Sequence, residues 1–210
     1  MQNGFRKCLA EALTRELPGA KAHRKMVPPG RTLLPPDDRT AVKRSGVLFL
    51  LFPEDGRLYT CLIRRPGTMK HHPGQIGFPG GKAEPADRNP ESTAEREAME
   101  EIGVSPSAYT VIGKLSDLYV PVSNFIIHPF VAWADRRPLF RISSSEVGRI
   151  ICFPLQDFME DEHYAETEVD TISGLLKVPY YPYDGEIIWG ATAMILSEFF
   201  DVTKRWPVQV

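Results

Sequence analysis

Four charged residues on one predicted helix, Arg96, Glu97, Glu100 and Glu101, have the types and spacing best suited to chemistry in this sequence. At about 100° of rotation per residue, Glu97 and Glu101 lie one helical turn apart and Glu100 lies beside them. Carboxylates this close repel each other, and a hard divalent cation that prefers oxygen ligands, such as Mg²⁺, would relieve the repulsion. Taken alone, such a helix is more often a solvated acidic face than a metal site. The segment that precedes the helix is therefore needed to distinguish the two interpretations.

That neighbouring segment is Phe78-Pro79-Gly80-Gly81, which precedes the helix. Its two glycines allow the backbone to turn tightly and to approach a ligand closely. A free carbonyl of Gly80 or Gly81 can then add a metal ligand. An ordinary turn is the alternative for this segment alone, but its combination with an acidic helix is far rarer than either feature separately.

The helix itself is predicted over residues 90–102. Asn89 is a favourable N-cap, Pro90 suits the first helical position, and Gly103 is a plausible C-terminal stop. An apolar stripe runs along one side of this helix and consists of Ala94, Ala98 and Ile102. We therefore expect one side to pack on a sheet while the acidic side faces a cleft.

The remaining segments predict strands around that helix. Apolar runs indicate strands at residues 47–52, 58–63, 110–115, 126–133 and 149–154. The first two are joined by a turn at residues 53–56 and should form a hairpin. Further helices are predicted at residues 1–20 and 188–200, with a proline-rich arm lacking long regular structure at 21–44. The fold class is therefore α/β, with residues 1–45 packed as helix and arm on a domain spanning 46–203.

Composition and charge narrow the class of protein. The chain has 210 residues, of which 42% are hydrophobic, and a formal net charge of −2, so no nucleic-acid footprint is expected. No apolar run approaches the roughly 20 residues of a membrane span, and no signal peptide is recognisable, so we expect a cytoplasmic protein. Three widely spaced cysteines, Cys8, Cys61 and Cys152, argue against a zinc site and for reduced thiols.

Residues 96–104 resemble the signature of the Nudix hydrolases, G-x5-E-x7-R-E-U-x-E-E-x-G-U, in which U is a bulky aliphatic residue. Within the helix only Ala98 is smaller than the pattern requires. Upstream, Gly81 stands 15 positions before Arg96 instead of 14, and Asp87 occupies the place of the first glutamate. One extra loop residue explains this offset and leaves the helix unchanged.

The resemblance implies an α/β/α sandwich with a mixed sheet and a reaction in which water attacks phosphorus in a P–O–P linkage. It implies Mg²⁺ or Mn²⁺ as cofactor, with Glu97 and Glu101 as principal metal ligands and Glu100 as the third carboxylate. Arg96 completes the predicted catalytic set by holding a helix carboxylate, although a plain surface salt bridge is the alternative. The general base stays open between a signature glutamate and one outside it, the candidates being Glu146, Glu160, Glu162, Glu166 and Glu168.

Upstream of the signature, residues 61–81 resemble the coenzyme A diphosphatase branch of that family, whose pattern is L-L-T-x-R-S-x3-R-x-H-x-G-Q-x3-F-P-G-G. Leu62, Arg65, His72, Gly74, Gln75 and residues 78–81 agree with it, whereas Ile63, Pro66 and Lys70 depart from it. Residues 188–193 and the long spacing before Arg96 are also typical of this branch. The branch implies cleavage to 4′-phosphopantetheine and adenosine 3′,5′-bisphosphate. The expected substrate-binding residues are Arg65, Lys70, His72, Gly80 and Gly81, with His71 as a further cation.

Two other functions stay open at this stage. ADP-ribose or related dinucleotide pyrophosphatases would share every metal ligand, and a catalytically silent nucleotide sensor would usually lack some of these carboxylates. The expected partner is a small nucleotide substrate, without nucleic acid or membrane. A homodimer through the N-terminal helix or the Trp189 region is possible on sequence grounds.

Overall fold

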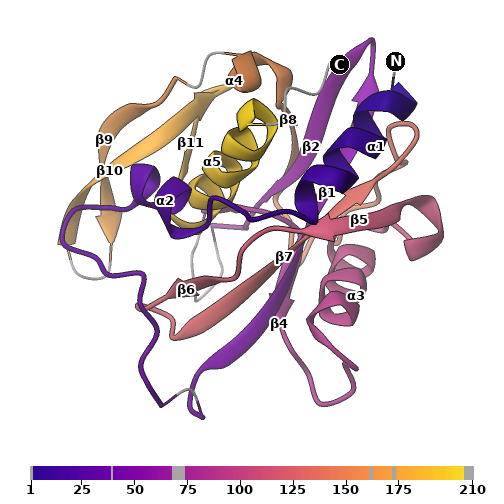
Figure 1. The fold of residues 1–210 in the computed structure, drawn as a ribbon. Helices are drawn as coiled ribbons and strands as arrows, with labels where there is room; N and C mark the ends of the chain where they lie inside the picture. The colour runs from indigo at the N-terminus through magenta and orange to yellow at the C-terminus, as the bar shows by residue number, and fades with distance from the viewer. Residues whose placement is uncertain (1, 39, 68–73, 161–162, 172–173, 206–210) are drawn as a thin grey trace.

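The computed structural model describes residues 2–38, 40–67, 74–160, 163–171 and 174–205 (Figure 1). Its helices are α1 (Gln2–Leu13), α2 (Ala20–His23), α3 (Pro90–Ile102), α4 (Gln156–Glu160) and α5 (Gly190–Arg205), with 3₁₀ turns η1 (Arg24–Met26) and η2 (Pro106–Ala108). The strands of the larger sheet are β1 (Lys43–Glu54), β2 (Arg57–Arg64), β3 (Ile76–Gly77), β4 (Gly80–Lys82), β5 (Thr110–Lys114), β6 (Leu118–Val120), β7 (Phe125–Trp133) and β8 (Arg149–Pro154). A smaller sheet contains β9 (Ala165–Thr171), β10 (Gly174–Tyr183) and β11 (Glu186–Trp189).

The larger sheet is mixed. Strands β1 and β7 run parallel at its centre, and the predicted hairpin of β1 and β2 is antiparallel. Strand β8 pairs antiparallel with the other side of β2, while β5 pairs with β7 and β4 pairs with the first half of β1. This order places the start of β1 between β4 and β7, beside the segment that leads into α3.

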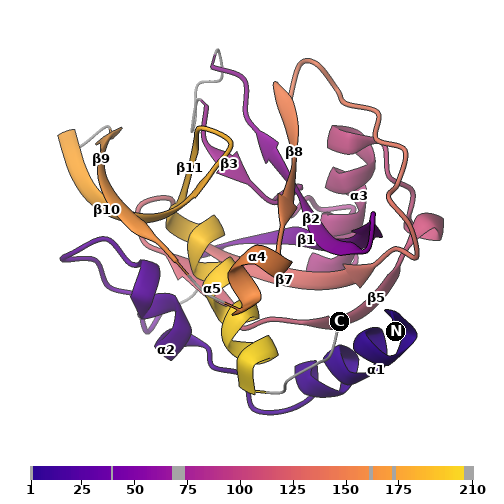
Figure 2. The ribbon, with the colours of Figure 1, turned by 90° about the horizontal axis from the view of Figure 1, so that it is seen from above.

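Helices cover both faces of this sheet, as Figure 2 shows, so the predicted α/β/α sandwich is confirmed. Along β1, Leu48 and Leu50 face the cluster under α3, whereas Phe49 and Leu51 face the larger cluster that includes α1 and α5. Burial on both faces explains why β1 reads as a continuous apolar run instead of an alternating one.

Helix α3 has the predicted bounds because its capping signals are local. The Asn89 side chain accepts the Ser92 N–H, the Ser92 hydroxyl accepts the Asn89 N–H, and Gly103 ends the helix at φ 68°. Gly46 on β1 permits the close approach of helix and sheet, since a Cβ there would lie 2.0 Å from the Pro90 carbonyl oxygen. The helix is therefore fixed in position as well as in extent.

The N-terminal region packs on the α5 side of the sheet. Helix α1 ends at Leu13 and does not reach the predicted residue 20, because Pro18 disfavours helix at Leu17 and Gly19 takes a φ of 53°. The arm forms α2 and η1 before losing regular structure. Buried Glu198 on α5 accepts hydrogen bonds from the N–H groups of Gly19 and Ser116 at 2.9 and 3.1 Å and lies 3.0 Å from His23 Nε2. These contacts attach the arm to the body.

The smaller sheet and α5 complete the molecule. The predicted helix at 188–200 begins too early, because Ile188 and Trp189 belong to β11 and Gly190, at φ 64°, separates strand from helix.

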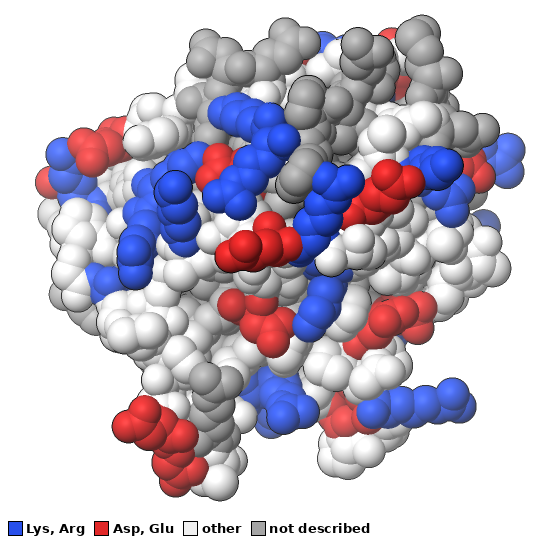
Figure 3. Space-filling model, viewed as in Figure 1, with Lys and Arg blue, Asp and Glu red and all other residues white. Residues whose placement is uncertain are grey.

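On the face seen in Figure 3, acidic and basic side chains are interspersed, which agrees with the near-zero net charge. No helix in the described ranges is long and apolar enough to cross a membrane.

Candidate active site

The acidic side of α3 lies against the glycine turn at the start of β4. Glu101 is only 3% exposed, and its Oε2 accepts the Gly80 N–H at 2.9 Å. Gly81 faces Glu97 so closely that a Cβ on it would lie 2.2 Å from Oε1 of that glutamate. The two glycines that the sequence indicated therefore meet two of the three predicted carboxylates directly.

Gly80 has a backbone conformation that few other residues adopt. Its φ is 155°, and a Cβ there would lie 2.4 Å from the Gly46 carbonyl oxygen. Pairing of Gly81 with Gly46 in the sheet holds this turn in place. A side chain at Gly80 would push β4 away from the backbone of β1, whereas one at Gly81 would displace the Glu97 carboxylate, which explains the glycine pair physically.

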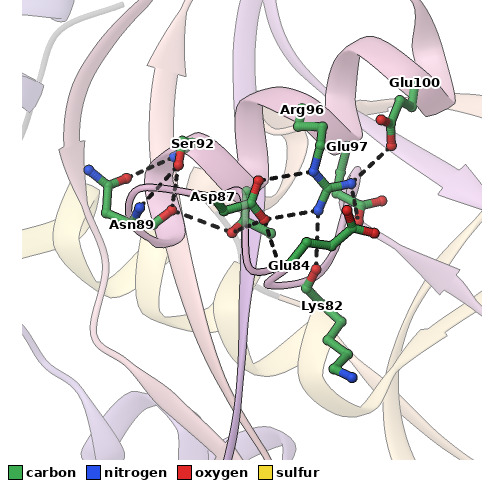
Figure 4. A network of polar contacts seen from close by, with 9 residues as sticks. Lys82, Glu84, Asp87, Asn89, Ser92, Arg96, Glu97 and Glu100 are labelled. Carbon is green, nitrogen blue, oxygen red and sulfur yellow. Dashed lines mark hydrogen bonds and ion pairs between the residues drawn. The ribbon is translucent and has the colours of Figure 1, made fainter.

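Arg96 is the centre of a network of ion pairs, which Figure 4 shows. Its guanidinium donates to Glu97 Oε1 and to Glu100 Oε2, both at 3.0 Å, and to the Lys82 carbonyl oxygen at 3.2 Å. The prediction that Arg96 pairs with helix carboxylates agrees with these contacts. Whether it serves catalysis stays a prediction.

Asp87 holds the other edge of that guanidinium and was not assigned a role from the sequence. Its two carboxylate oxygens accept from Arg96 Nε and Nη2 at 3.0 Å each. Thr93 Oγ1 and the Glu84 N–H also donate to Oδ2 of this aspartate, each at 2.9 Å. The Arg96 hydrogen bonds, followed by the Glu84 N–H, hold the pKa of Asp87 well below its ordinary value. The only sequence signal was its place in the signature.

Burial changes the acidity of the two inner glutamates. It raises the pKa of Glu101 to about 7, against the opposing Gly80 N–H and Arg65 charge. Burial also raises the pKa of Glu97, although Arg96 opposes the shift. In such surroundings, added positive charge stabilises the ionised form of a carboxylate.

The donor set suits a hard divalent cation. Three carboxylates from one helix and nearby backbone carbonyls offer oxygen ligands only, which Mg²⁺ and Mn²⁺ prefer. Among the residues that the structure describes, however, no three acidic, histidine or cysteine side chains already converge to hold an ion. Arg96 binds Glu97 and Glu100, and the Gly80 N–H binds Glu101, so an ion would have to compete for these oxygens. The metal-ligand assignment stays a prediction.

Of the predicted substrate-binding side chains, Arg65 lies at this site. Its guanidinium donates to the Gly80 carbonyl oxygen at 3.5 Å, and its N–H donates to the Gln75 carbonyl oxygen at 3.0 Å. The other predicted cations, Lys70, His71 and His72, lie outside the described ranges. Arg65 therefore provides a cation beside Glu101.

One candidate base stands near the inner glutamates. The loop between β7 and β8 is attached to the end of α3, since the Ser143 N–H donates to the Glu101 carbonyl oxygen at 3.0 Å. Glu146 follows on this loop, and its charge adds to the effect of burial in raising the pKa of both Glu97 and Glu101. Its side chain is exposed to solvent.

The other candidates lie elsewhere or are not described. Glu166 and Glu168 lie on β9 of the smaller sheet, both exposed, and Glu166 pairs with Lys177 at 2.6 Å. Glu160 ends α4, and Glu162 lies outside the described residues. Of the candidates whose side chains the structure describes, Glu146 is the one whose charge acts on the acidic side of α3.

Comparisons with known proteins agree on one family. The NUDIX domain matches residues 42–170 of the chain. The mitochondrial Nudix hydrolase 15 of Arabidopsis thaliana is 34% identical over 176 residues, which cover 81% of this chain and 62% of that protein. The peroxisomal coenzyme A diphosphatase ndx-8 of Caenorhabditis elegans is 39% identical over 130 residues, which cover 60% of this chain and 55% of that protein. The chain thus spans less than two thirds of the length of either relative.

A solved structure supports the same fold. The Nudix hydrolase RenU from M. smegmatis has a TM-score of 0.53 and 18% identity, and the match covers 79% of this chain and 88% of that chain. At this identity the likeness concerns the fold alone.

The expectation of a cytoplasmic protein is wrong. The two relatives above are named as mitochondrial and peroxisomal proteins, and a third is named as chloroplastic, which points away from a plain cytoplasmic location. The error has a physical reason. An apolar segment reports contact with a membrane, and its absence does not distinguish one aqueous compartment from another.

Proposed function

Because the chain belongs to the Nudix family, we propose that it is a metal-dependent pyrophosphohydrolase that cleaves the diphosphate bond of coenzyme A or a coenzyme A derivative. The observation that carries this proposal is the approach of Glu97 and Glu101 to the turn at Gly80 and Gly81. It brings two buried carboxylates and the backbone of the turn together at one place, where a divalent cation would link them to a charged diphosphate.

The protein contributes position and charge to this reaction. Glu97, Glu100 and Glu101 are the residues that would hold Mg²⁺ or Mn²⁺, and a bound ion would neutralise phosphate charge and lower the pKa of the attacking water. Arg96 orients two of these carboxylates, and Arg65 provides a cation near the diphosphate. Attack of water on phosphorus breaks one P–O bond, and the bridging oxygen leaves with the other phosphate. The products are 4′-phosphopantetheine and adenosine 3′,5′-bisphosphate.

We assign the role of general base to Glu146. Its loop is fixed by backbone hydrogen bonds to the end of α3, and its charge acts on both inner glutamates. A solvent-exposed carboxylate at this place can accept a proton from water and return it to solvent. Glu146→Gln should lower kcat on the order of 100-fold with KM little changed, as general-base catalysis contributes. Exposed Glu168→Gln is the matched control, and equal rates in the two variants would remove Glu146 from this role.

Two findings support coenzyme A over other substrates. Residues 61–81 resemble the coenzyme A diphosphatase pattern, and ndx-8, which carries that name, is 39% identical over its matched region. ADP-ribose and related dinucleotides are the second candidate, because the metal-binding residues would be the same. They lack the pantetheine arm, so the residues that bind that arm would distinguish them.

A substrate panel tests the proposal. Coenzyme A, ADP-ribose, NADH and diadenosine polyphosphates are incubated with the enzyme and either Mg²⁺ or Mn²⁺, and the products are identified by mass. We expect kcat/KM to be highest for coenzyme A, with activity lost on chelation of the metal. Faster turnover of ADP-ribose would overturn the branch assignment. Nucleotide binding without metal-dependent hydrolysis would indicate a nucleotide sensor. In that case the Glu97→Gln and Glu101→Gln variants should bind the nucleotide as tightly as the unmodified protein does.

The domain division and the oligomeric state are further parts of this proposal. We propose residues 46–203 as the hydrolase domain, with residues 1–45 packed on it, and a homodimer as the oligomeric state. Sedimentation or light scattering measures the oligomeric state directly. A monomer at working concentration would remove the dimer without affecting the assignment of the active site.

A further inference from the structure

Two cysteines face each other across the strand pair β2 and β8. Cys61 and Cys152 are directly opposite in the antiparallel register, and both are free thiols. Residues opposite each other in an antiparallel pair have Cα atoms about 4.5–5.5 Å apart and side chains on the same face. A disulfide requires Cα atoms about 4.4–6.8 Å apart. The register therefore brings the two Cα atoms within the range that a disulfide spans, and the two Cβ atoms would have to approach each other by roughly 0.5–1 Å to close the bond.

The surroundings of the two thiols differ. Cys61 is fully buried in the cluster under α3, whereas Cys152 packs at the border of that cluster and is partly accessible. Burial raises the pKa of both thiols, and the charge of Arg137 opposes that rise in both cases. The thiols thus stay mainly protonated, and their oxidation should be slow but directed to the accessible partner first.

We propose that Cys61 and Cys152 form an oxidative modification site, which hydrogen peroxide converts into a cross-strand disulfide. In the first step the Cys152 sulfur gives two electrons to peroxide, becomes a sulfenic acid and releases one water. In the second step the Cys61 sulfur attacks the Cys152 sulfur, the sulfenic hydroxyl leaves, and it takes the Cys61 proton to form a second water. Two thiols are oxidised and one peroxide is reduced.

The disulfide would strengthen a pairing on which the proposed site depends. Among the described strands, β8 pairs only with β2, beside which it lies in Figure 2, and it follows the loop that carries Glu146. The Gly148 N–H donates to the Arg64 carbonyl oxygen at 2.8 Å where this loop enters β8. A bond from residue 61 to residue 152 closes a long loop in the unfolded chain, so Tm should rise on the order of 10 °C.

The experiment uses the full chain with Cys8→Ser, which removes the exposed third thiol. The protein is treated with hydrogen peroxide, denatured, alkylated and weighed by mass spectrometry, and Tm is recorded before and after reduction. We expect the loss of two hydrogen atoms, no alkylation until a reductant is added, and a reversible rise of Tm. The variants Cys8→Ser/Cys61→Ala and Cys8→Ser/Cys152→Ala are the matched controls, and neither should show a reversible rise.

Other results would overturn the proposal. They are two alkylatable thiols after treatment, stable addition of oxygen to Cys152, and a disulfide between two chains. If a control variant does not fold, the mass and thiol count of the Cys8→Ser protein still decide the question. None of these measurements depends on the proposed hydrolase activity, so the two proposals fail separately.

Discussion

Replacing Asp87 by Asn tests whether the network around Arg96 positions the acidic side of α3. The change keeps the shape of the side chain but removes the charge and one of two acceptors for the guanidinium. The Asp87 side chain is 6% exposed and that of Arg96 is 23% exposed, so solvent replaces the lost bond only in part. One hydrogen bond between charged groups contributes about 1.5–3 kcal/mol. We therefore expect the free energy of unfolding to fall by about 2 kcal/mol.

The effect on the proposed reaction should be larger than the effect on stability. Without Asp87, Arg96 can rotate, and Glu97 and Glu100 lose a fixed partner. Displacement of a catalytic group by about 1 Å can cost on the order of 100-fold in rate. We expect kcat for coenzyme A with Mg²⁺ to fall by between about 10- and 100-fold, with KM within about threefold.

Steady-state product release and urea unfolding measure the two quantities separately. Glu84→Gln is the matched control, because its exposed carboxylate lies in the same loop and only its backbone N–H bonds to Asp87. Asp87→Asn with kcat equal to that of Glu84→Gln would refute the reasoning and leave Arg96 held by its other partners. A fall in stability without a fall in kcat would make the network purely structural.

Two further changes probe the glycine turn and the attachment of the arm. Gly81→Ala places a Cβ against the Glu97 carboxylate, which can rotate away. We therefore expect kcat to fall on the order of 100-fold, while the free energy of unfolding in urea changes by less than about 1 kcal/mol. An unchanged kcat would contradict the close approach of Gly81 and Glu97. Burial tends to raise the pKa of Glu198, but hydrogen bonds from His23 and Ser116 outweigh it and lower the pKa. This stabilisation is present above the ordinary glutamate pKa of about 4.3 and is lost as pH falls through the lower folded value, so Glu198→Gln should destabilise the protein at pH 7 and less at low pH. Urea unfolding at both pH values measures the difference, and an equal loss at both would contradict the assignment.

Helix α3 was predicted with the correct bounds because its determinants are close in sequence. Asn89, Ser92 and Gly103 act on the helix ends themselves, and an apolar stripe indicates the buried side. The central strands were also predicted, since burial on both faces leaves long apolar runs. Their order in the sheet was not predicted, because the pairing of β1 with β7 joins residues about 80 positions apart, where sequence periodicity carries no information.

The shortest and most polar strands were missed for the same reason. Strands β3 and β4 have two and three residues and exist only because β2 and β1 lie beside them. Strand β9 alternates acidic residues with threonine and valine, and β10 contains two prolines, so neither shows the apolar pattern of a strand. Tertiary pairing supplies what local preference does not.

The candidate site was partly predictable because some of its features depend on residues close in sequence and others on contacts between residues far apart in sequence. The carboxylates on α3 follow from helical spacing, but the contact of Gly81 with Glu97 depends on the depth at which α3 sits on the sheet. That depth is limited at Gly46, whose importance no local pattern indicates, since it stands at the edge of the apolar run of β1. A Cβ at Gly46 would meet backbone atoms of Pro90 and Ala94, which cannot rotate away as a side chain can. Gly46→Ala should therefore move the whole helix, whereas Gly81→Ala should move only one carboxylate.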